Sequence, residues 1–227
     1  MSNNILFRGS MLLLILPLML SAQSVPNLIP NIGCRVEYAK KEIDHSEARN
    51  DCAWDYIHTG CSWYCGWRDS RISASSTLPR FKGITYGANN LDDFNYRTAW
   101  VEGVPGYGIG QTITYSLHPE TPRITNVHIV NGYVKSAKSW SDNARVKTLK
   151  MYVNQQPFAI LHLKDVKNEQ TFEFRPIAHK EKLRNPNGDH ERLSWWSITF
   201  EILAVYPGAK FEDTAISDIY FSGLDVH

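Results

Sequence analysis

The polar residues between Asp92 and Thr98 form the stretch best suited to bind a cation. Asp93, Asn95 and Thr98 carry carboxylate, amide and hydroxyl oxygens at short spacing. Hard cations such as Ca²⁺ take these ligand types from tight loops. The same residues are also typical of an Asx-turn, in which the acid accepts a hydrogen bond from a nearby backbone N–H. The residue types and spacing leave both interpretations open.

Paired carboxylates are the one enzymatic option that remains. The sequence lacks a His-Glu-x-x-His motif, a Gly-x-Ser-x-Gly motif and a P-loop. Asp92, Asp93 and Glu102 lie close together in sequence, and Glu212 and Asp213 lie near the C-terminus. A glycosidase needs two carboxyl groups at a set separation across a sugar, which sequence spacing does not define. Acidic residues are common on protein surfaces, and we expect no enzyme activity.

The N-terminus is typical of an exported protein. Residues 1–22 predict a signal peptide, with Arg8 in a positive n-region, an apolar run over residues 11–20 and small residues at the end. Pro17 interrupts the apolar run, which is also short for a membrane span. We expect the mature protein to be secreted, periplasmic or at the cell surface, without membrane insertion.

All four cysteines lie in the first third of the chain: Cys34, Cys52, Cys61 and Cys65. An even count in an oxidising compartment favours disulfides, although four cysteines allow three connectivities. A metal site that includes His58 is the alternative. It is disfavoured because three residues separate Cys61 and Cys65 and no second pair with zinc-finger spacing follows. We expect two intramolecular disulfides in a Cys-rich extension over residues 23–70.

Charge and composition exclude some classes of partner. The formal net charge is +1, and 21% of the residues are charged. This balance does not support a general binder of nucleic acid or of membrane surfaces. Aromatic residues make up 12% of the chain, which suits a β-rich core and leaves rings for a binding face.

The elements that must position these residues are short strands. Residues 111–117, 149–153 and 196–202 alternate apolar and polar side chains, the period of a strand with one buried face. Turn signals separate such segments, and the glycine-rich turn at residues 103–110 leads into a strand. A dinucleotide site would need a helix there. The pattern predicts an all-β sandwich or jelly roll over residues 71–227. Residues 131–145 are expected to be a polar loop, and residues 23–33 a flexible or loosely docked arm.

The segment from Asp93 to Trp100, Asp-Phe-Asn-Tyr-Arg-Thr-Ala-Trp, resembles a signature of galactose-binding-like domains of the discoidin or coagulation factor type C group. The usual form is Asp-Gly-Asp, two residues, then Thr-x-Trp. More closely, residues 86–223 resemble the discoidin-like domain named for NAD glycohydrolase, a glycan-binding and translocation module. The matching pieces are residues 98–103, 106–110, 131–133, 143–147, 200–202 and 215–219. The resemblance implies a galactose-binding-like β-sandwich jelly roll, with no NAD glycohydrolase catalytic domain in this chain.

The resemblance also implies a metal site. It implies a structural calcium ion near Asp93, Asn95 and Thr98, with Asp218 as a further ligand, because such sandwiches bring the last strand beside that loop. This sequence departs from the usual signature by having Phe94 in place of Gly and Asn95 in place of the second Asp.

The function implied by the resemblance is non-catalytic binding of a cell-surface or matrix glycan. Sugar sites need an aromatic plane and planar hydrogen-bonding groups, and residues 131–145 carry both. The candidates are Tyr133 and Trp140 for stacking, and Asn131, Lys135, Asn143 and Arg145 for hydrogen bonding. In the alternative interpretation, Trp140 plugs the end of the sandwich and Arg145 pairs with Asp142 or Glu102. A structural or protein-interaction sandwich without a sugar site is the first rival function, and a glycosidase is the second.

Overall fold

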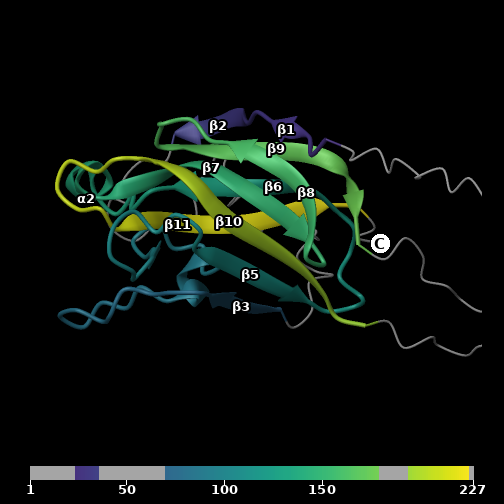
Figure 1. Ribbon diagram of the computed structural model, residues 1–227, viewed down its shortest axis with the longest axis horizontal. Coiled ribbons are helices and arrows are strands. Elements are labelled where there is room, and N and C mark those ends of the chain that lie inside the picture. The colour runs from purple at the N-terminus through teal and green to yellow at the C-terminus, as the bar shows by residue number, and fades with distance from the viewer. Residues whose placement is uncertain (1–23, 36–69, 179–193, 225–227) are drawn as a thin grey trace, which may run out of the picture.

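Strands dominate the computed structural model, which describes residues 24–35, 70–178 and 194–224 (Figure 1). The two described helices are short, η2 (Ala88–Leu91) and α2 (Ala137–Asp142). The all-β prediction is therefore confirmed. The strands are β1 (Asn27–Leu28), β2 (Asn31–Arg35), β3 (Arg71–Ala74), β4 (Trp100–Val101), β5 (Thr112–Leu117), β6 (Ile124–Asn131), β7 (Ala144–Val153), β8 (Gln156–His162), β9 (Asn168–Ile177), β10 (Trp196–Tyr206) and β11 (Thr214–Gly223).

The strands pair in the order β2-β9-β6-β11-β7-β10-β5-β3, with β8 beside β7 and β4 beside β11. The pairing is antiparallel except where β11 meets β7 and where β1 meets β8. The β11–β7 contact is confined to Thr214 and Ala215 at the start of β11. Beyond it β11 runs along β6 while β7 runs along β10, so two groups of strands diverge and face each other across the core.

The core fills the space between these two groups. On β5, and on β10 as far as Ile202, buried apolar residues alternate with partly exposed polar ones, as the period-two pattern predicts. Tyr115 of β5 spans the core: its hydroxyl donates to the Ile219 carbonyl of β11 at 2.8 Å. Its ring meets Phe200 and Phe221 edge-on, with centroids 6.3 and 5.0 Å apart. Tyr115 therefore ties one face of the sandwich to the other.

β6 and β11 are buried along nearly their whole length, on both faces. The core covers one face, and the loop at residues 92–98 lies over the other. The ring of Phe94 contacts that of Tyr220 at 5.6 Å between centroids, and Tyr96 packs against Val130 and Val134. The loop that carries the candidate cation ligands is thus held on the sheet by aromatic side chains.

The N-terminal segment is docked, so the prediction of a flexible or loosely docked arm is wrong. β1 pairs in parallel with β8, and β2 pairs with β9. Side chains add to this: Asn168 Nδ2 donates to the Gly33 carbonyl at 2.9 Å and Asn31 Nδ2 donates to Glu173 at 3.0 Å. Exposed strand edges offer unpaired backbone groups, and the arm uses those of β8 and β9.

Several sequence predictions fall outside the described residues. The signal peptide at residues 1–22 and three of the four cysteines, Cys52, Cys61 and Cys65, belong to this group. The export and disulfide predictions therefore stay predictions. Within the described residues, no helix is both long enough and apolar enough to span a bilayer.

Candidate functional site

Residues 131–145 form a fixed structure at one end of the sandwich. They contain the helix α2, which the expectation of a plain polar loop missed. Ser136 and Ser139 cap its first turn reciprocally: Ser136 Oγ accepts from the Ser139 N–H at 3.0 Å, and Ser139 Oγ accepts from the Ser136 N–H at 2.9 Å. These bonds satisfy donors that a helix start leaves without partners.

Asn131 is buried and joins the end of β6 to β7. Its Nδ2 donates to the Val146 carbonyl at 2.7 Å, and its Oδ1 accepts from the Val146 N–H at 3.0 Å. Since both ends of the amide are used inside the protein, Asn131 acts as a positioning residue.

Arg145 is 7% exposed and its guanidinium is enclosed by acceptors. Nε and Nη2 form a bidentate pair with Asp165 at 2.7 and 3.0 Å. Nη1 donates to the carbonyls of Trp140 at 3.2 Å and Asn143 at 3.0 Å. The partner is therefore Asp165 rather than Asp142 or Glu102. Asp142 instead pairs with Lys138 across one helical turn at 2.5 Å.

Trp140 is half-buried and its indole is fixed. Nε1 donates to the Asn131 carbonyl at 3.1 Å. Arg145 Cζ lies 4.3 Å and Lys167 Nζ 5.0 Å from the centroid of the ring, within range of cation–π attraction. Gly132 has φ +81°, and a Cβ there would lie 2.8 Å from Trp140 Cδ1. The position of the indole therefore depends on a glycine at residue 132, and two cations lie beside the ring.

Lys135 is the exposed member of the six candidate binding residues. Tyr133 is buried, meets Tyr86 edge-on at 6.5 Å, and has a raised pKa because of burial first and Tyr86 second. Asn143 ends α2 and donates to the Ser139 carbonyl at 2.8 Å. The structure thus gathers Asn131, Trp140, Asn143 and Arg145 in one network. It adds Asp165 and Lys167 from the β8–β9 connection, which nothing in the sequence links to them.

The loop at residues 92–98 has the hydrogen bonds of an Asx-turn. Asp93 Oδ1 accepts from the Asn95 N–H at 2.9 Å, and Oδ2 accepts from Thr98 Oγ1 at 2.7 Å. Asn95 Oδ1 accepts from the Arg97 N–H at 3.1 Å. Phe94 has φ +50°, in the left-handed region where the usual signature has glycine.

Asp218 of β11 lies fully buried near this loop. Neither of its carboxylate oxygens has a hydrogen-bond partner of normal geometry among the described residues. Burial, and then the neighbouring carboxylates of Asp92 and Asp93, raise its pKa well above the ordinary value. A buried carboxylate in this situation requires a proton or a cation.

The loop that brings Asp93 near Asp218 carries oxygen atoms of the kinds that a hard cation takes. Asp93 and Asp218 supply carboxylates, Asn95 an amide oxygen and Thr98 a hydroxyl, which are the ligand types that Ca²⁺ takes. No three His, Cys, Asp or Glu side chains in the described part of the chain gather to hold a metal ion. A site here would therefore depend on amide, hydroxyl and backbone oxygens besides the two carboxylates.

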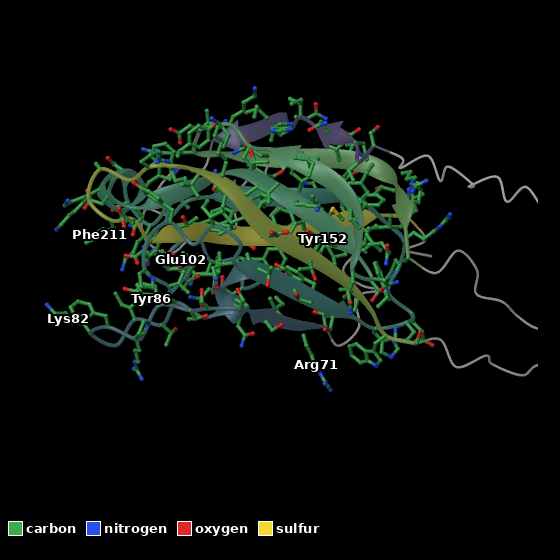
Figure 2. All side chains as sticks on the ribbon, in the orientation of Figure 1. Arg71, Lys82, Tyr86, Glu102, Tyr152 and Phe211 are labelled. Atoms are coloured by element: carbon green, nitrogen blue, oxygen red, sulfur yellow. The ribbon has the colours of Figure 1, made fainter. Side chains whose placement is uncertain are left out.

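Glu102, the candidate catalytic acid that Figure 2 labels, holds the backbone of two segments in place. It is buried, and its carboxylate accepts from the backbone N–H groups of Val104 at 2.8 Å and Thr214 at 3.4 Å. A Cβ at Gly108 would lie 2.5 Å from Glu102 Cγ, so the glycine-rich turn wraps this side chain closely. Burial is the main cause of the raised pKa of Glu102. Glu102 thus ties the turn to the start of β11.

The fold and the two loop networks define a galactose-binding-like β-sandwich. The family model of the NAD glycohydrolase translocation F5/8 type C domain matches residues 63–222. The match covers well over half of the chain, and the chain belongs to this family. Both the resemblance and the predicted jelly-roll sandwich are confirmed. A search of curated proteins found no match.

Two solved structures, both of Clostridium perfringens ZmpB, share the fold. One holds the CBM32-1 and CBM32-2 domains in complex with GalNAc: TM-score 0.50, 10% identity, covering 88% of this chain and 41% of that one. The other also includes the M60 catalytic domain: TM-score 0.52, 11% identity, covering 90% of this chain and 17% of that one. This chain therefore spans less than half of either. At these identities the likeness shows the fold alone.

Proposed function

We propose that this chain is a non-catalytic carbohydrate-binding module of an exported protein, directed at a cell-surface or matrix glycan. Membership of a type C domain family supports the proposal, as does a relative in fold whose CBM32 domains bind GalNAc. The observation that carries it is the fixed, partly exposed indole of Trp140 at the end of the sandwich. A rigid aromatic ring with cations beside it suits the apolar face and the hydroxyls of a sugar.

The geometry divides the six candidate residues into two groups. Trp140 and Lys135 reach solvent and are proposed to contact the glycan, together with Lys167 beside the indole. Asn131 and Arg145 are proposed to position Trp140, because their side chains are already occupied by protein partners. Asn143 closes α2. Tyr133 is buried beside Ala99, Val101 and Ala215 and is not proposed to contact the glycan.

Glycan-array binding by residues 23–227 tests the proposal. We expect binding to a defined set of sugars, without turnover of the bound glycan. Lys135→Ala should weaken it about 10- to 150-fold, the cost of one lost charge-assisted hydrogen bond. Lys138→Ala is the matched control, because Lys138 is an exposed lysine three residues away that pairs with Asp142. A folded protein that binds no sugar would overturn the proposal and favour a protein-interaction sandwich. Release of product from a bound glycan would favour a hydrolase.

We further propose a structural calcium ion between the loop at residues 92–98 and β11, with Asp93, Asn95, Thr98 and Asp218 as ligands. The support is the buried Asp218 carboxylate, which has no protein partner of normal geometry among the described residues and lies near two other carboxylates. A ligand that binds only the native state adds about 2.7 kcal/mol of stability at one hundred times its Kd.

Thermal unfolding in millimolar CaCl₂ and in chelator tests the ion. We expect a higher melting temperature with calcium for the wild type and no response in Asp218→Asn. Asp142→Asn, at an acid on α2, should respond as the wild type does. Equal melting temperatures of the wild type in calcium and in chelator would contradict the ion. The buried carboxyl group of Asp218 would then be neutralised by a proton in place of a cation.

A further inference from the structure

The region around Trp195 places a second aromatic side chain at the surface. Trp195 is 46% exposed, whereas its neighbour Trp196 is 3% exposed. Trp195 directly precedes β10, which begins at Trp196. Successive residues of extended backbone point to opposite sides, so Trp196 enters the core and Trp195 faces solvent. The extended backbone thus exposes Trp195 and buries Trp196.

Two other side chains converge on this indole from neighbouring strands. β5 lies between β3 and β10. Its Ser116 pairs with Arg71 of β3, and its Leu117 pairs with Trp196 of β10. This register places Arg71, His118 and Trp195 at the same end of three adjacent strands. Arg71 Cζ lies 5.3 Å from the centroid of the Trp195 ring. The imidazole of His118 meets that ring edge-on at 5.5 Å.

The hydrogen-bond donors around this ring have no protein acceptor among the described residues. His118 Nδ1 accepts from the Glu120 N–H at 3.1 Å, so the neutral imidazole carries its proton on Nε2. Among the described residues, no hydrogen bond engages His118 Nε2, Trp195 Nε1 or the Arg71 guanidinium. No described carboxylate pairs with Arg71 either. This contrasts with Arg145, whose guanidinium is enclosed by Asp165 and two carbonyls.

We propose that Trp195, Arg71 and His118 form a binding site for an acidic saccharide, one whose ring carries a carboxylate. The indole takes the apolar face of the sugar ring. The guanidinium matches a carboxylate in a bidentate fork, and the His118 Nε2–H donates to a hydroxyl. The expectation that the ligand is a saccharide rests on the proposed function. The location of the site does not.

This site lies apart from the α2 end. The Phe211 N–H donates to the Asp142 carbonyl at 2.8 Å, so Phe211 marks the α2 end. Figure 2 shows Phe211 at the left of the molecule and Arg71 toward the lower right. The module would therefore present two separate sugar-contacting faces, which a branched or extended glycan chain can bridge.

Isothermal titration calorimetry of residues 23–227 with oligogalacturonate, its methyl ester and sialyllactose tests the site. We expect at least one of the two acidic sugars to bind and the neutral methyl ester to bind at least 10-fold more weakly. Trp195→Ala should weaken binding of the acidic sugar at least 10-fold. Arg71→Gln should remove the preference for the acid over the ester. Trp195→Phe should retain part of the affinity, because a smaller aromatic plane remains.

Paired variants separate this site from the proposed one. Lys135→Ala should leave binding of the acidic sugar unchanged, and Trp195→Ala should leave binding at the α2 end unchanged. If neither acidic sugar binds, or if binding survives in both Trp195→Ala and Arg71→Gln, the inference is overturned whatever the array shows. If the acidic sugar binds through Trp195 while Lys135→Ala affects nothing, the inference stands and the α2 site fails.

Discussion

The two ends of the sandwich carry the same kinds of side chain and use them in different ways. At the α2 end, Trp140 and Arg145 are bonded to Asn131, Asp165 and backbone carbonyls. Around Trp195, an indole and an arginine also lie together, but the described residues supply no acid to the arginine. The difference shows that protein acceptors hold the arginine in place at the α2 end, whereas the described residues leave Arg71 without such acceptors.

Burial explains the difference. A guanidinium removed from water must be paired and fully hydrogen-bonded. Arg145 is 7% exposed, and its partners come from α2 and from the β8–β9 connection. Arg71 is exposed and remains hydrated, so it can exchange water for a ligand. The guanidinium at the α2 end is therefore tied to the protein, and the guanidinium of Arg71 is not.

The largest expected effect is at Asp165. Asp165→Ala leaves the buried guanidinium of Arg145 without its counter-charge and should lower the free energy of unfolding by about 3 kcal/mol. Urea denaturation measures the change. Lys138→Ala, which breaks an exposed ion pair on the same side of the molecule, should cost less than about 0.5 kcal/mol. Similar costs for the two variants would show that the α2 end is not held by this pair.

The two tryptophans should differ in stability by a smaller amount. Trp140→Ala loses the hydrogen bond to the Asn131 carbonyl and the packing against Val130 and Val134. We expect a cost of about 2 kcal/mol. Trp195→Ala removes a side chain that is 46% exposed and should change stability by less than about 0.5 kcal/mol. Thermal and urea unfolding of both variants measure this. A larger loss of stability in Trp195→Ala than in Trp140→Ala would contradict the assignment of Trp140 as the structurally held side chain.

The smallest expected effect is a pH dependence at Glu102. Burial raises its pKa in the folded state. A raised pKa means that Glu102 favours folding below its ordinary pKa, and that this contribution is lost as pH rises through the folded value. The melting temperature of the wild type minus that of Glu102→Gln should therefore become more positive as pH falls from 7 toward 4. A flat difference would show that the two backbone N–H bonds balance burial, and one of opposite sign would show that they outweigh it.

Local patterns in the sequence predicted the strands well. Alternation of Ile113, Tyr115 and Leu117 with polar residues gave β5, because a strand with one buried face needs period two. The helix α2 was missed, because its capping pair is Ser136 and Ser139 rather than the Ser/Thr-x-x-Glu/Gln pattern that marks a capping box in sequence. The docking of β1 and β2 was also missed, because two- to five-residue strands depend on which sheet edges are free.

The sequence by itself determined the all-β class, the family resemblance and the inventory of candidate residues at 131–145 and 92–98, since these follow from residue type and local spacing. Only the tertiary structure decided which of those residues have their polar groups bonded within the protein. Arg145 meets Asp165 twenty residues away, and Asp218 reaches the loop at 92–98 only because β11 lies beneath it. Local spacing carries no information on the separation of distant atoms, and that separation determines whether a polar group is satisfied by the protein or remains available to a ligand.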